Sequence, residues 1–307
     1  MQFDIRVAPD GYAWWYVDAI SDDGAHGLTI IAFIGSVFSP YYAWSKTRDP
    51  FHHCALNVAL YGAKPNRWAM TERGRDAIKV TKTQFQIGNS ALSWDGDSLF
   101  IEVNETTVPI PSPLRGRVRV RPQFLSTTEF MIDDEARHFW RPVAPCAHVE
   151  VDFERPDLKW FGYGYSDTNR GDEPLERAFR YWDWSRAEIS QHETAILYNT
   201  DLWNGGKKSL ALRFGSDGRW EEFAPPDVAS LPATPIWRIK RRTRAEKTHP
   251  VKILKTFEDT PFYSRSMIES DLFGVTFRSM HESFSGERLR LPIVKALLPF
   301  RMPRIAR

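Results

Sequence analysis

The chain has 307 residues, of which 42% are apolar, 26% charged and 14% aromatic, with 12 tryptophans. Such a composition is typical of a folded globular protein with a sizeable core and not of a disordered chain. The formal net charge of +2 argues against a nucleic-acid-binding protein that depends on a strongly basic surface. The aromatic content favours a large apolar cavity or a β-rich core.

The sequence shows neither a recognisable secretion signal nor an apolar segment long enough for a membrane-spanning helix. The N-terminal stretch "MQFDIRVAPDGYAWW" lacks the basic and apolar regions of a signal peptide. The longest apolar run, "GLTIIAFIGSVF" (27–38), has about 12 residues, which is too few to cross a bilayer as a helix. Two cysteines are too few for a disulfide framework. We therefore expect a cytoplasmic protein with reduced thiols.

The first half of the chain shows short runs with a period of two, rich in β-branched and aromatic residues. Such runs, bounded by Gly, Asp, Asn or Pro, predict strands. The expected strands cover residues 11–21, 27–39, 52–62, 66–74, 91–105, 116–124, 148–154 and 158–167. Within them, "WDGDS" (94–98) has the Asp-Gly signature of a tight hairpin turn.

The second half continues the same pattern. Further strands are expected over residues 178–188, 194–203, 208–223, 235–243 and 263–285, with a second hairpin turn at "GSDGRW" (215–220). Strands at this spacing without intervening helices predict antiparallel sheets closed into barrels or sandwiches. Because one ordinary barrel holds fewer strands, we expect an all-β protein with two tandem β-barrel or sandwich domains.

Two segments are candidates for the domain boundary, the Pro-rich "RPVAPCAH" (141–148) and the polar "TNRGDEPLER" (168–177). The second is longer and wholly polar, so the expected domains are residues 1–172 and 173–285. Residues 286–307 form a tail that interleaves Arg and Lys with apolar residues, and its three prolines exclude a long helix. This tail is either a strap over the protein or an interfacial segment that contacts anionic lipid.

Standard catalytic motifs are missing from the sequence. There is no Gly-rich dinucleotide loop, no P-loop, no nucleophile elbow and no His-Glu-x-x-His metal motif. Cys54 and Cys146 have no second cysteine at zinc-ligand spacing. A metal or nucleotide cofactor is therefore not expected, and acids combined with aromatic residues are the remaining candidates for chemistry.

The stretch "FGYGYSDTNRG" (161–171) combines these residue types on one predicted strand. Side chains alternate between the two faces of a strand, so one face carries three rings followed by an acid, namely Phe161, Tyr163, Tyr165 and Asp167. The other face is nearly bare, because Gly162 and Gly164 lie there, which leaves room for another chain segment or for a ligand. From the residues alone, an Asp before Thr-Asn is usually an acid that caps a turn, so Asp167 is also readable in that way.

The same alternation occurs at three other places. It puts His138 and Trp140 on one face of an extended segment, and Trp14, Tyr16 and Asp18 on one face of another. In "YWDW" (181–184), Trp182 and Trp184 share a face. Aromatic stripes on strands are usually core, so each of these sets is also readable as structural.

An acid at the closed end of an aromatic cavity has a definite chemistry. Desolvation disfavours its charged form, so that it stays protonated near neutrality. Such an acid can protonate an alkene, and the faces of Trp or Tyr stabilise the resulting carbocation by about 0.5–2 kcal/mol each.

Several long motifs resemble the carotenoid 1,2-hydratases, also called hydroxyneurosporene synthases. They are "GYAWWYVDAISDDGAHGLTIIAFIGSVFSPYY", "HHCALNVALYG", "RWAMTERG", "GYGYSDTNRGDEPLE" and "RYWDWSRAE". The resemblance covers about residues 8–285. It implies two tandem lipocalin-like domains and cofactor-independent addition of water to the terminal C1–C2 double bond of an acyclic carotenoid. Typical substrates are neurosporene and lycopene, and the 1-hydroxy products lead to spheroidene or spirilloxanthin in photosynthetic bacteria.

The family pattern pairs His-x-Trp with a downstream Tyr-x-Asp, which His138, Trp140, Tyr165 and Asp167 match. The resemblance implies that Asp167 donates a proton to C2 and, as a carboxylate, takes the proton from the attacking water. Trp140 and Tyr165 would stabilise the cation, and His138 would orient Asp167 or the water. The other aromatic residues of the paired faces are expected to bind substrate: Trp14, Tyr16, Phe161, Tyr163, Trp182 and Trp184.

A carotenoid is too insoluble to diffuse freely, so we expect a cytoplasmic enzyme associated peripherally with the inner or photosynthetic membrane. Two rival readings remain open at this point. A non-catalytic lipocalin-like carrier would need the aromatic cavity but not the acid. An isoprenoid cyclase would use the same acid and rings but exclude water. The preferred carotene, hydration at one end or both, and the oligomeric state stay open.

Overall fold

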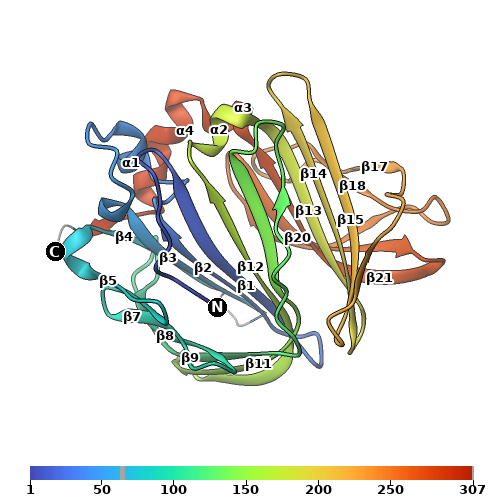
Figure 1. The fold of residues 1–307 in the computed structure, drawn as a ribbon, viewed down its shortest axis with the longest axis horizontal. Coiled ribbons are helices and arrows are strands. Elements are labelled where there is room, and N and C mark those ends of the chain that lie inside the picture. The colour runs from blue at the N-terminus through green and yellow to red at the C-terminus, as the bar shows by residue number, and fades with distance from the viewer. Residues whose placement is uncertain (63–65, 306–307) are drawn as a thin grey trace. The chain divides into compact units, whose positions relative to one another are not determined.

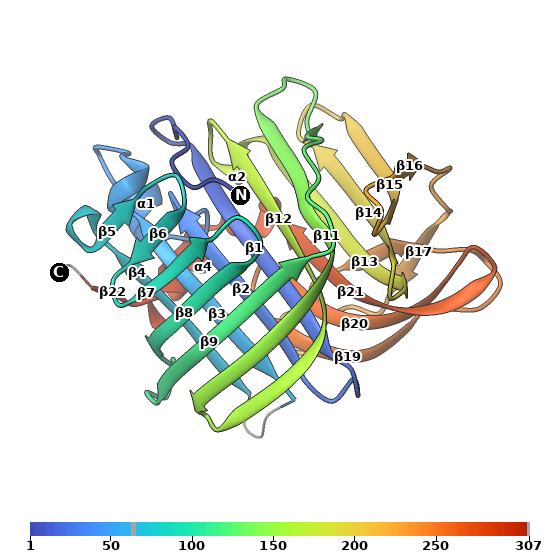
Figure 2. The ribbon, with the colours of Figure 1, turned by 60° about the horizontal axis from the view of Figure 1, so that its bottom comes forward.

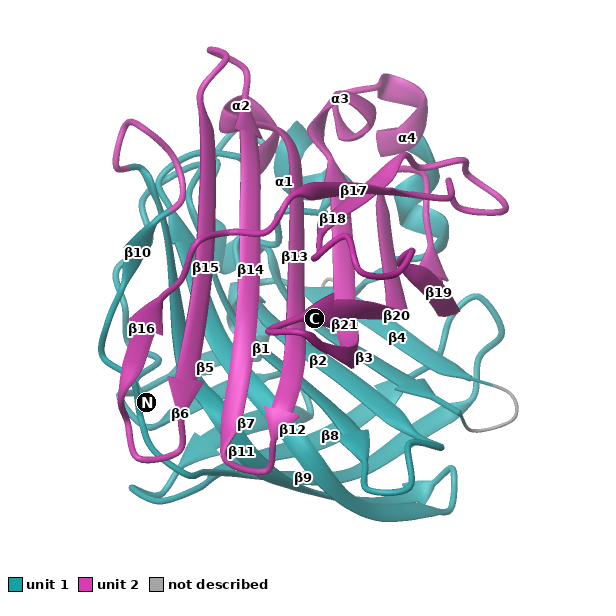
Figure 3. Ribbon diagram, turned by 90° about the vertical axis from the view of Figure 1, so that its right-hand side faces the viewer, with its two compact units in different colours: residues 1–131, 137–174, 296–307 teal, residues 132–136, 175–295 magenta. Residues whose placement is uncertain are grey.

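Strands dominate the computed structural model, which describes residues 1–62 and 66–305, and helices are limited to short connections (Figure 1). The chain divides by its internal contacts into two units, coloured separately in Figure 3. Unit 1 comprises Met1–Met131, Arg137–Pro174 and Ala296–Arg307, and unit 2 comprises Ile132–Ala136 and Leu175–Lys295. The expected all-β, two-part antiparallel fold is confirmed. The limits 1–172 and 173–285 stay a prediction about domains.

Unit 1 is built on one sheet that curls strongly (Figure 2). Over the described residues this sheet has 13 strands, in the order β22-β4-β3-β2-β1-β12-β11-β9-β8-β7-β6-β5, with β10 paired to β11. Its strands are β1 (Tyr12–Ser21), β2 (Gly27–Ile34), β3 (Cys54–Tyr61), β4 (Arg67–Arg73), β5 (Ile78–Val80), β6 (Gln84–Ile87), β7 (Ser90–Trp94), β8 (Leu99–Thr106), β9 (Pro113–Pro122), β10 (Phe130–Met131), β11 (His138–Arg155), β12 (Leu158–Gly171) and β22 (Arg304–Ile305). Short helices lie at α1 (Pro40–Trp44) and at three 3-10 turns, Pro50–His52, Arg75–Ala77 and Leu298–Phe300.

Unit 2 has a seven-stranded sheet in the order β16-β15-β14-β13-β21-β20-β19 and a two-stranded sheet of β17 and β18, counted over the described part of the chain. Its strands are β13 (Phe179–Ser190), β14 (Glu193–Leu202), β15 (Lys207–Gly215), β16 (Trp220–Glu222), β17 (Val228–Leu231), β18 (Arg241–Arg244), β19 (Lys252–Asp259), β20 (Tyr263–Leu272) and β21 (Val275–Ser285). Three short helices are α2 (Leu175–Ala178), α3 (Gly286–Leu289) and α4 (Pro292–Leu297).

The central strand β1 is buried along both of its faces. Trp15 and Val17 point into the main apolar cluster of unit 1, where the Trp15 ring lies 5.4 Å from that of Phe85. Tyr16 and Asp18 point to the opposite face, and they too are buried. Because both faces are covered, polar side chains on the second face require hydrogen-bond partners within the protein.

Several sequence-based expectations about local structure are confirmed. The hairpin turn at residues 94–98 joins β7 to β8, and the turn at 215–220 joins β15 to β16. In the first turn, the Asp95 carboxylate accepts backbone hydrogen bonds from Asp97 and Ser98 at 2.9 and 2.7 Å. The prolines of the C-terminal segment do break it into short helices, as expected.

Other expectations are wrong. The strand expected to end at Asp167 continues to Gly171, because β1 and β11 pair with it on both sides. The candidate boundary at 141–148 lies inside β11, where the register shifts between Pro142 and Ala147 absorb the prolines. The strand expected over 235–243 is reduced to β18, and β5, β6, β10, β17, β19 and β22 were not expected.

The C-terminal end of unit 1 covers an edge of its sheet. β22 pairs in parallel with β4, and the Glu72 backbone N–H donates to the Pro303 carbonyl at 3.0 Å. The Arg304 guanidinium pairs with the buried Glu72 carboxylate, which also contacts the Nδ1 atom of His53 at 2.8 Å. An otherwise exposed strand edge is thereby occupied.

The two glycines of β12 are explained by the approach of β1. A Cβ atom on Gly162 would lie 1.9 Å from the carbonyl oxygen of Ile20, and one on Gly164 would lie 2.5 Å from that of Asp18. The bare face therefore accommodates another segment of the chain.

We expect Gly162→Ala to lower the free energy of unfolding by about 2–3 kcal/mol, because rigid backbone stands where the methyl group would go. Gly74→Ala serves as the control, since its Cβ would come no closer than 3.8 Å to another atom. Urea denaturation of both variants measures the difference. Equal stability of the two variants would contradict the close approach.

Candidate active site

The centre of the candidate site is the carboxyl group of Asp167, in the middle of β12. Its Oδ2 atom accepts hydrogen bonds from the Trp140 indole N–H at 2.9 Å and from the Tyr165 hydroxyl at 2.8 Å. Trp140 and Tyr165 are fully buried, and Asp167 is 5% exposed. Three of the four residues of the predicted His-x-Trp and Tyr-x-Asp pattern are thus in direct contact.

Strand pairing accounts for this contact. In β11 and β12, Pro142 lies opposite Asp167, and Trp140 lies opposite Asn169, two residues away along each strand. The indole therefore lies on the same face of the sheet as the acid. Tyr165 precedes Asp167 by two residues and therefore shares its face. Phe130, on β10, packs against the Trp140 ring with 5.6 Å between ring centroids.

Burial and charge act together on the Tyr165 phenol. Burial raises its pKa well above the ordinary value, and the negative charges of Asp167 and Asp18 raise it further. The phenol is consequently neutral at physiological pH and donates its proton to Asp167 in a hydrogen bond.

His138 has different neighbours. Its Nδ1 atom shares a hydrogen bond of 2.8 Å with the Tyr12 hydroxyl, and its Nε2 atom lies 3.5 Å from the Glu173 carboxylate. It pairs with Gly171, four positions along β12 from Asp167, which corresponds to roughly 13 Å between backbones. The structure therefore places His138 on the same face as Asp167 but next to Tyr12 and Glu173.

The rings of β1 extend the aromatic face. The Tyr12 and Trp14 rings stack with 5.0 Å between centroids, and Phe33 on β2 meets Trp14 edge-on at 6.0 Å. Tyr16 meets Tyr165 edge-on at 6.1 Å. The predicted residues Trp14 and Tyr16 are thus brought to the same face of the sheet as the acid.

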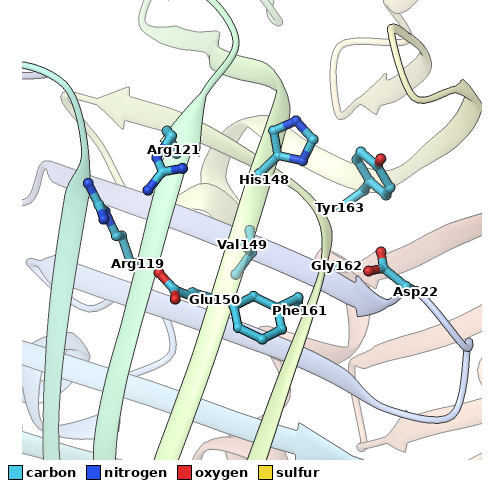
Figure 4. A pocket seen from close by; sticks show the side chains of 9 residues that line it. All are labelled: Asp22, Arg119, Arg121, His148, Val149, Glu150, Phe161, Gly162 and Tyr163. Atoms are coloured by element: carbon cyan, nitrogen blue, oxygen red, sulfur yellow. The ribbon is translucent and has the colours of Figure 1, made fainter.

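Phe161 and Tyr163 occupy the outer end of the stripe. Tyr165 is fully buried, Tyr163 is half-buried and Phe161 is 53% exposed, so that burial increases along β12 toward Asp167. Both outer residues border a pocket of about 200 Å³, shown in Figure 4. Its wall includes the charged side chains of Arg119, Arg121 and Glu150.

Trp182 and Trp184 belong to β13 of unit 2, and their expected role in binding substrate stays a prediction. Both are buried, and Trp182 packs against Tyr198 and Phe284 with 5.4 Å between ring centroids in each case. Within their own unit they lie among core side chains.

Sequence reasoning missed two residues of this face, Tyr12 and Glu173, and it grouped Asp18 with Trp14 and Tyr16 without giving it a role. Tyr12 carried a usable signal, because it shares the parity of Trp14 and Tyr16 on β1. Glu173 carried none beyond its place in the "GDEPLE" motif. Among the described residues, no three His, Cys, Asp or Glu side chains are grouped so as to hold a metal ion.

Comparison with known proteins assigns the chain to a family. The family model described as carotenoid hydratase CrtC matches residues 30–307. The chain belongs to the carotenoid hydratase CrtC family. The expected enzyme class, a carotenoid hydratase and therefore a hydro-lyase, is confirmed.

Two relatives of this CrtC chain are acyclic carotenoid 1,2-hydratases. That of Thiocapsa roseopersicina is 55% identical and that of Rubrivivax gelatinosus 49% identical, each match covering 99% of this chain and 76% of the relative. A solved structure of kievitone hydratase from Nectria haematococca aligns with a TM-score of 0.56 over 91% of this chain and 90% of that one. At 8% identity, this likeness concerns the lipocalin-like fold alone.

Proposed function

We propose that this CrtC chain adds water to the terminal C1–C2 double bond of an acyclic carotenoid, such as neurosporene or lycopene, to give a 1-hydroxy carotenoid. The substrate class is supported by the two relatives named acyclic carotenoid 1,2-hydratase. The observation that carries the chemistry is the buried Asp167 carboxyl group, held between the indole of Trp140 and the phenol of Tyr165.

Asp167 is the proposed proton donor. Both aromatic donors bind its Oδ2 atom, so in the acid form the proton is carried by Oδ1. This role requires that Asp167 carries a proton before the reaction begins. Transfer of this proton to C2 leaves a tertiary cation at C1, and this explains why a tertiary alcohol would form.

Trp140 and Tyr165 are the proposed cation-stabilising groups. Their polar hydrogens bind Asp167, and in this proposal their π faces stabilise the positive charge by about 0.5–2 kcal/mol each. His138 is a positioning residue in this proposal. It is anchored by Tyr12 and Glu173, and it holds the start of β11 two residues before Trp140.

The wild-type protein, incubated anaerobically with lycopene, should convert it to a product heavier by one water, measured by mass spectrometry. Asp167→Asn should stay folded and lose at least about 100-fold in rate, since no acid remains to protonate the alkene. An unchanged carotene would favour a carrier, and an isomer of equal mass would favour a cyclase. Substantial hydration by Asp167→Asn would rule out the proton-donor role.

We expect Trp140→Phe to lose less hydration rate than Trp140→Ala, because the phenyl ring keeps part of the π face. Each variant also loses the indole N–H bond to Asp167, so that comparing the two isolates the contribution of the ring. Initial rates with lycopene, at matched thermal stability, give the comparison. Equal losses would count against cation stabilisation.

We further propose that the tail formed by residues 286–307 docks on an anionic membrane, from which a carotenoid would be taken up. Phe300 is 75% exposed, Ile293 and Ile305 are exposed as well, and Arg301 lies beside Phe300 on the surface. Exposed apolar residues next to basic ones suit a lipid headgroup region, where each Arg or Lys contributes about 1 kcal/mol. No helix in the described residues is both long and apolar enough to span a bilayer.

Phe300→Ser should weaken binding to vesicles of mixed neutral and anionic phospholipid by roughly tenfold, because a partly inserted ring is lost. Ile110→Ser is the matched control, since Ile110 is 80% exposed and lies outside this segment. Cosedimentation of both variants with the vesicles measures the effect. If the two variants bind equally well, the segment is not the docking element.

A further inference from the structure

Strands β1 and β12 run antiparallel, and each carries a Tyr-x-Asp motif. Tyr16 and Asp18 on β1 repeat the spacing of Tyr165 and Asp167 on β12. The antiparallel register sets Tyr16 opposite Asp167 and Asp18 opposite Tyr165. Because residues directly opposite each other on paired strands point to the same side, all four side chains lie on one face of the sheet. The neighbouring course of the two strands is visible in Figure 1.

Each phenol serves the acid of its own strand. The Tyr16 hydroxyl donates to Asp18 Oδ2 at 3.1 Å, as the Tyr165 hydroxyl donates to Asp167 Oδ2 at 2.8 Å. The Tyr16 and Tyr165 rings meet edge-on, with 6.1 Å between their centroids. Asp18 is fully buried.

The register also sets the separation of the two acids. Asp18 and Asp167 are diagonal neighbours across the strand pair, which corresponds to roughly 7–8 Å between their backbones. The two carboxyl groups thus lie on adjacent strands and on one face of the sheet, an arrangement in which one group can act as the acid and the other as the base.

Hydration requires a proton acceptor as well as a donor. The reaction forms a C2–H bond and a C1–O bond, and it breaks the π bond between C1 and C2 and one O–H bond of water. On the basis of the proposed function, we propose that Asp18 is the base that accepts the proton of the attacking water, while Asp167 donates the proton to C2. Water supplies the electron pair of the C1–O bond, and its released proton ends on Asp18. Exchange with solvent water then returns a proton to Asp167, so that the two carboxyl groups regain their starting states.

The experiment compares Asp18→Asn with Asp18→Glu, using lycopene dispersed in phospholipid. For Asp18→Asn we expect kcat to fall at least about 100-fold, as for loss of a general base, with KM and the melting temperature nearly unchanged. Asp18→Glu keeps a carboxylate and should retain more activity than Asp18→Asn. A purely structural role reverses this order, because Asn matches Asp in size while Glu adds a methylene group to a buried position.

Thr29→Val is the matched control. Thr29 lies opposite Asp18 on β2, on the same face, and is fully buried. Thr29→Val should keep kcat within about threefold of the wild-type value, because the buried hydroxyl that it removes takes no proton in the proposed reaction. If Asp18→Asn fails to fold, Tyr16→Phe decides, because it keeps the carboxylate but removes its 3.1 Å hydrogen bond. We expect this variant to lose about tenfold in kcat.

Two results would overturn the proposal. The first is an Asp18→Asn variant that is more active than Asp18→Glu. The second is an unchanged kcat in Asp18→Asn, or in Tyr16→Phe if Asp18→Asn does not fold. Wild-type protein and Asp167→Asn are assayed in parallel, so that failure of the proposed function can be told apart from failure of the assignment of Asp18. A wild type that hydrates lycopene, together with a fully active Asp18→Asn, would sink only the assignment of the base.

Discussion

The antiparallel register of β1 and β12 is the constraint on which the site depends. It runs without a shift from Tyr12 opposite Gly171 to Ser21 opposite Gly162. Side chains alternate with a period of two, so a slip by one residue would turn the acids into the apolar core and Trp15 out of it. The apolar side of the sheet thus specifies the position of every polar group on the other side. Gly162 and Gly164 take part in this specification, because they permit β1 to approach β12 as closely as it does.

A buried polar face is costly unless its groups are paired, since an unmade hydrogen bond costs about 1–3 kcal/mol. On this face aromatic side chains supply much of the pairing: the Trp140 indole and the Tyr165 phenol bind Asp167, Tyr16 binds Asp18, and Tyr12 binds His138. Aromatic donors leave their π faces unused by these bonds. In the proposed mechanism, the same residues that make burial of the acids tolerable are also those that stabilise the developing positive charge without reorganisation of solvent.

Local patterns in the sequence predicted which residues share a face, but not how deeply they are buried. The alternation that groups Phe161 with Tyr165 is correct, yet one ring is exposed and the other is fully buried. Asp167 was readable as a turn residue because Thr-Asn-Arg-Gly follows it, and pairing with β1 and β11 overrides that local preference. The combination of His138 and Trp140 with Tyr165 and Asp167 came from family resemblance. Contacts over long sequence separations, such as β22 with β4, leave no periodic signal.

The pairing of β22 with β4 has a consequence for biosynthesis. Residues 296–305 complete unit 1, but in the chain they follow the whole of unit 2. At a synthesis rate of about 5–20 residues per second, β4 emerges from the ribosome many seconds before its neighbour exists. During that interval its open edge can accept a strand from another nascent chain. The time before β22 leaves the ribosome, and any chaperone that shields β4 during it, would therefore influence the yield of native enzyme more than the stability of the folded enzyme does.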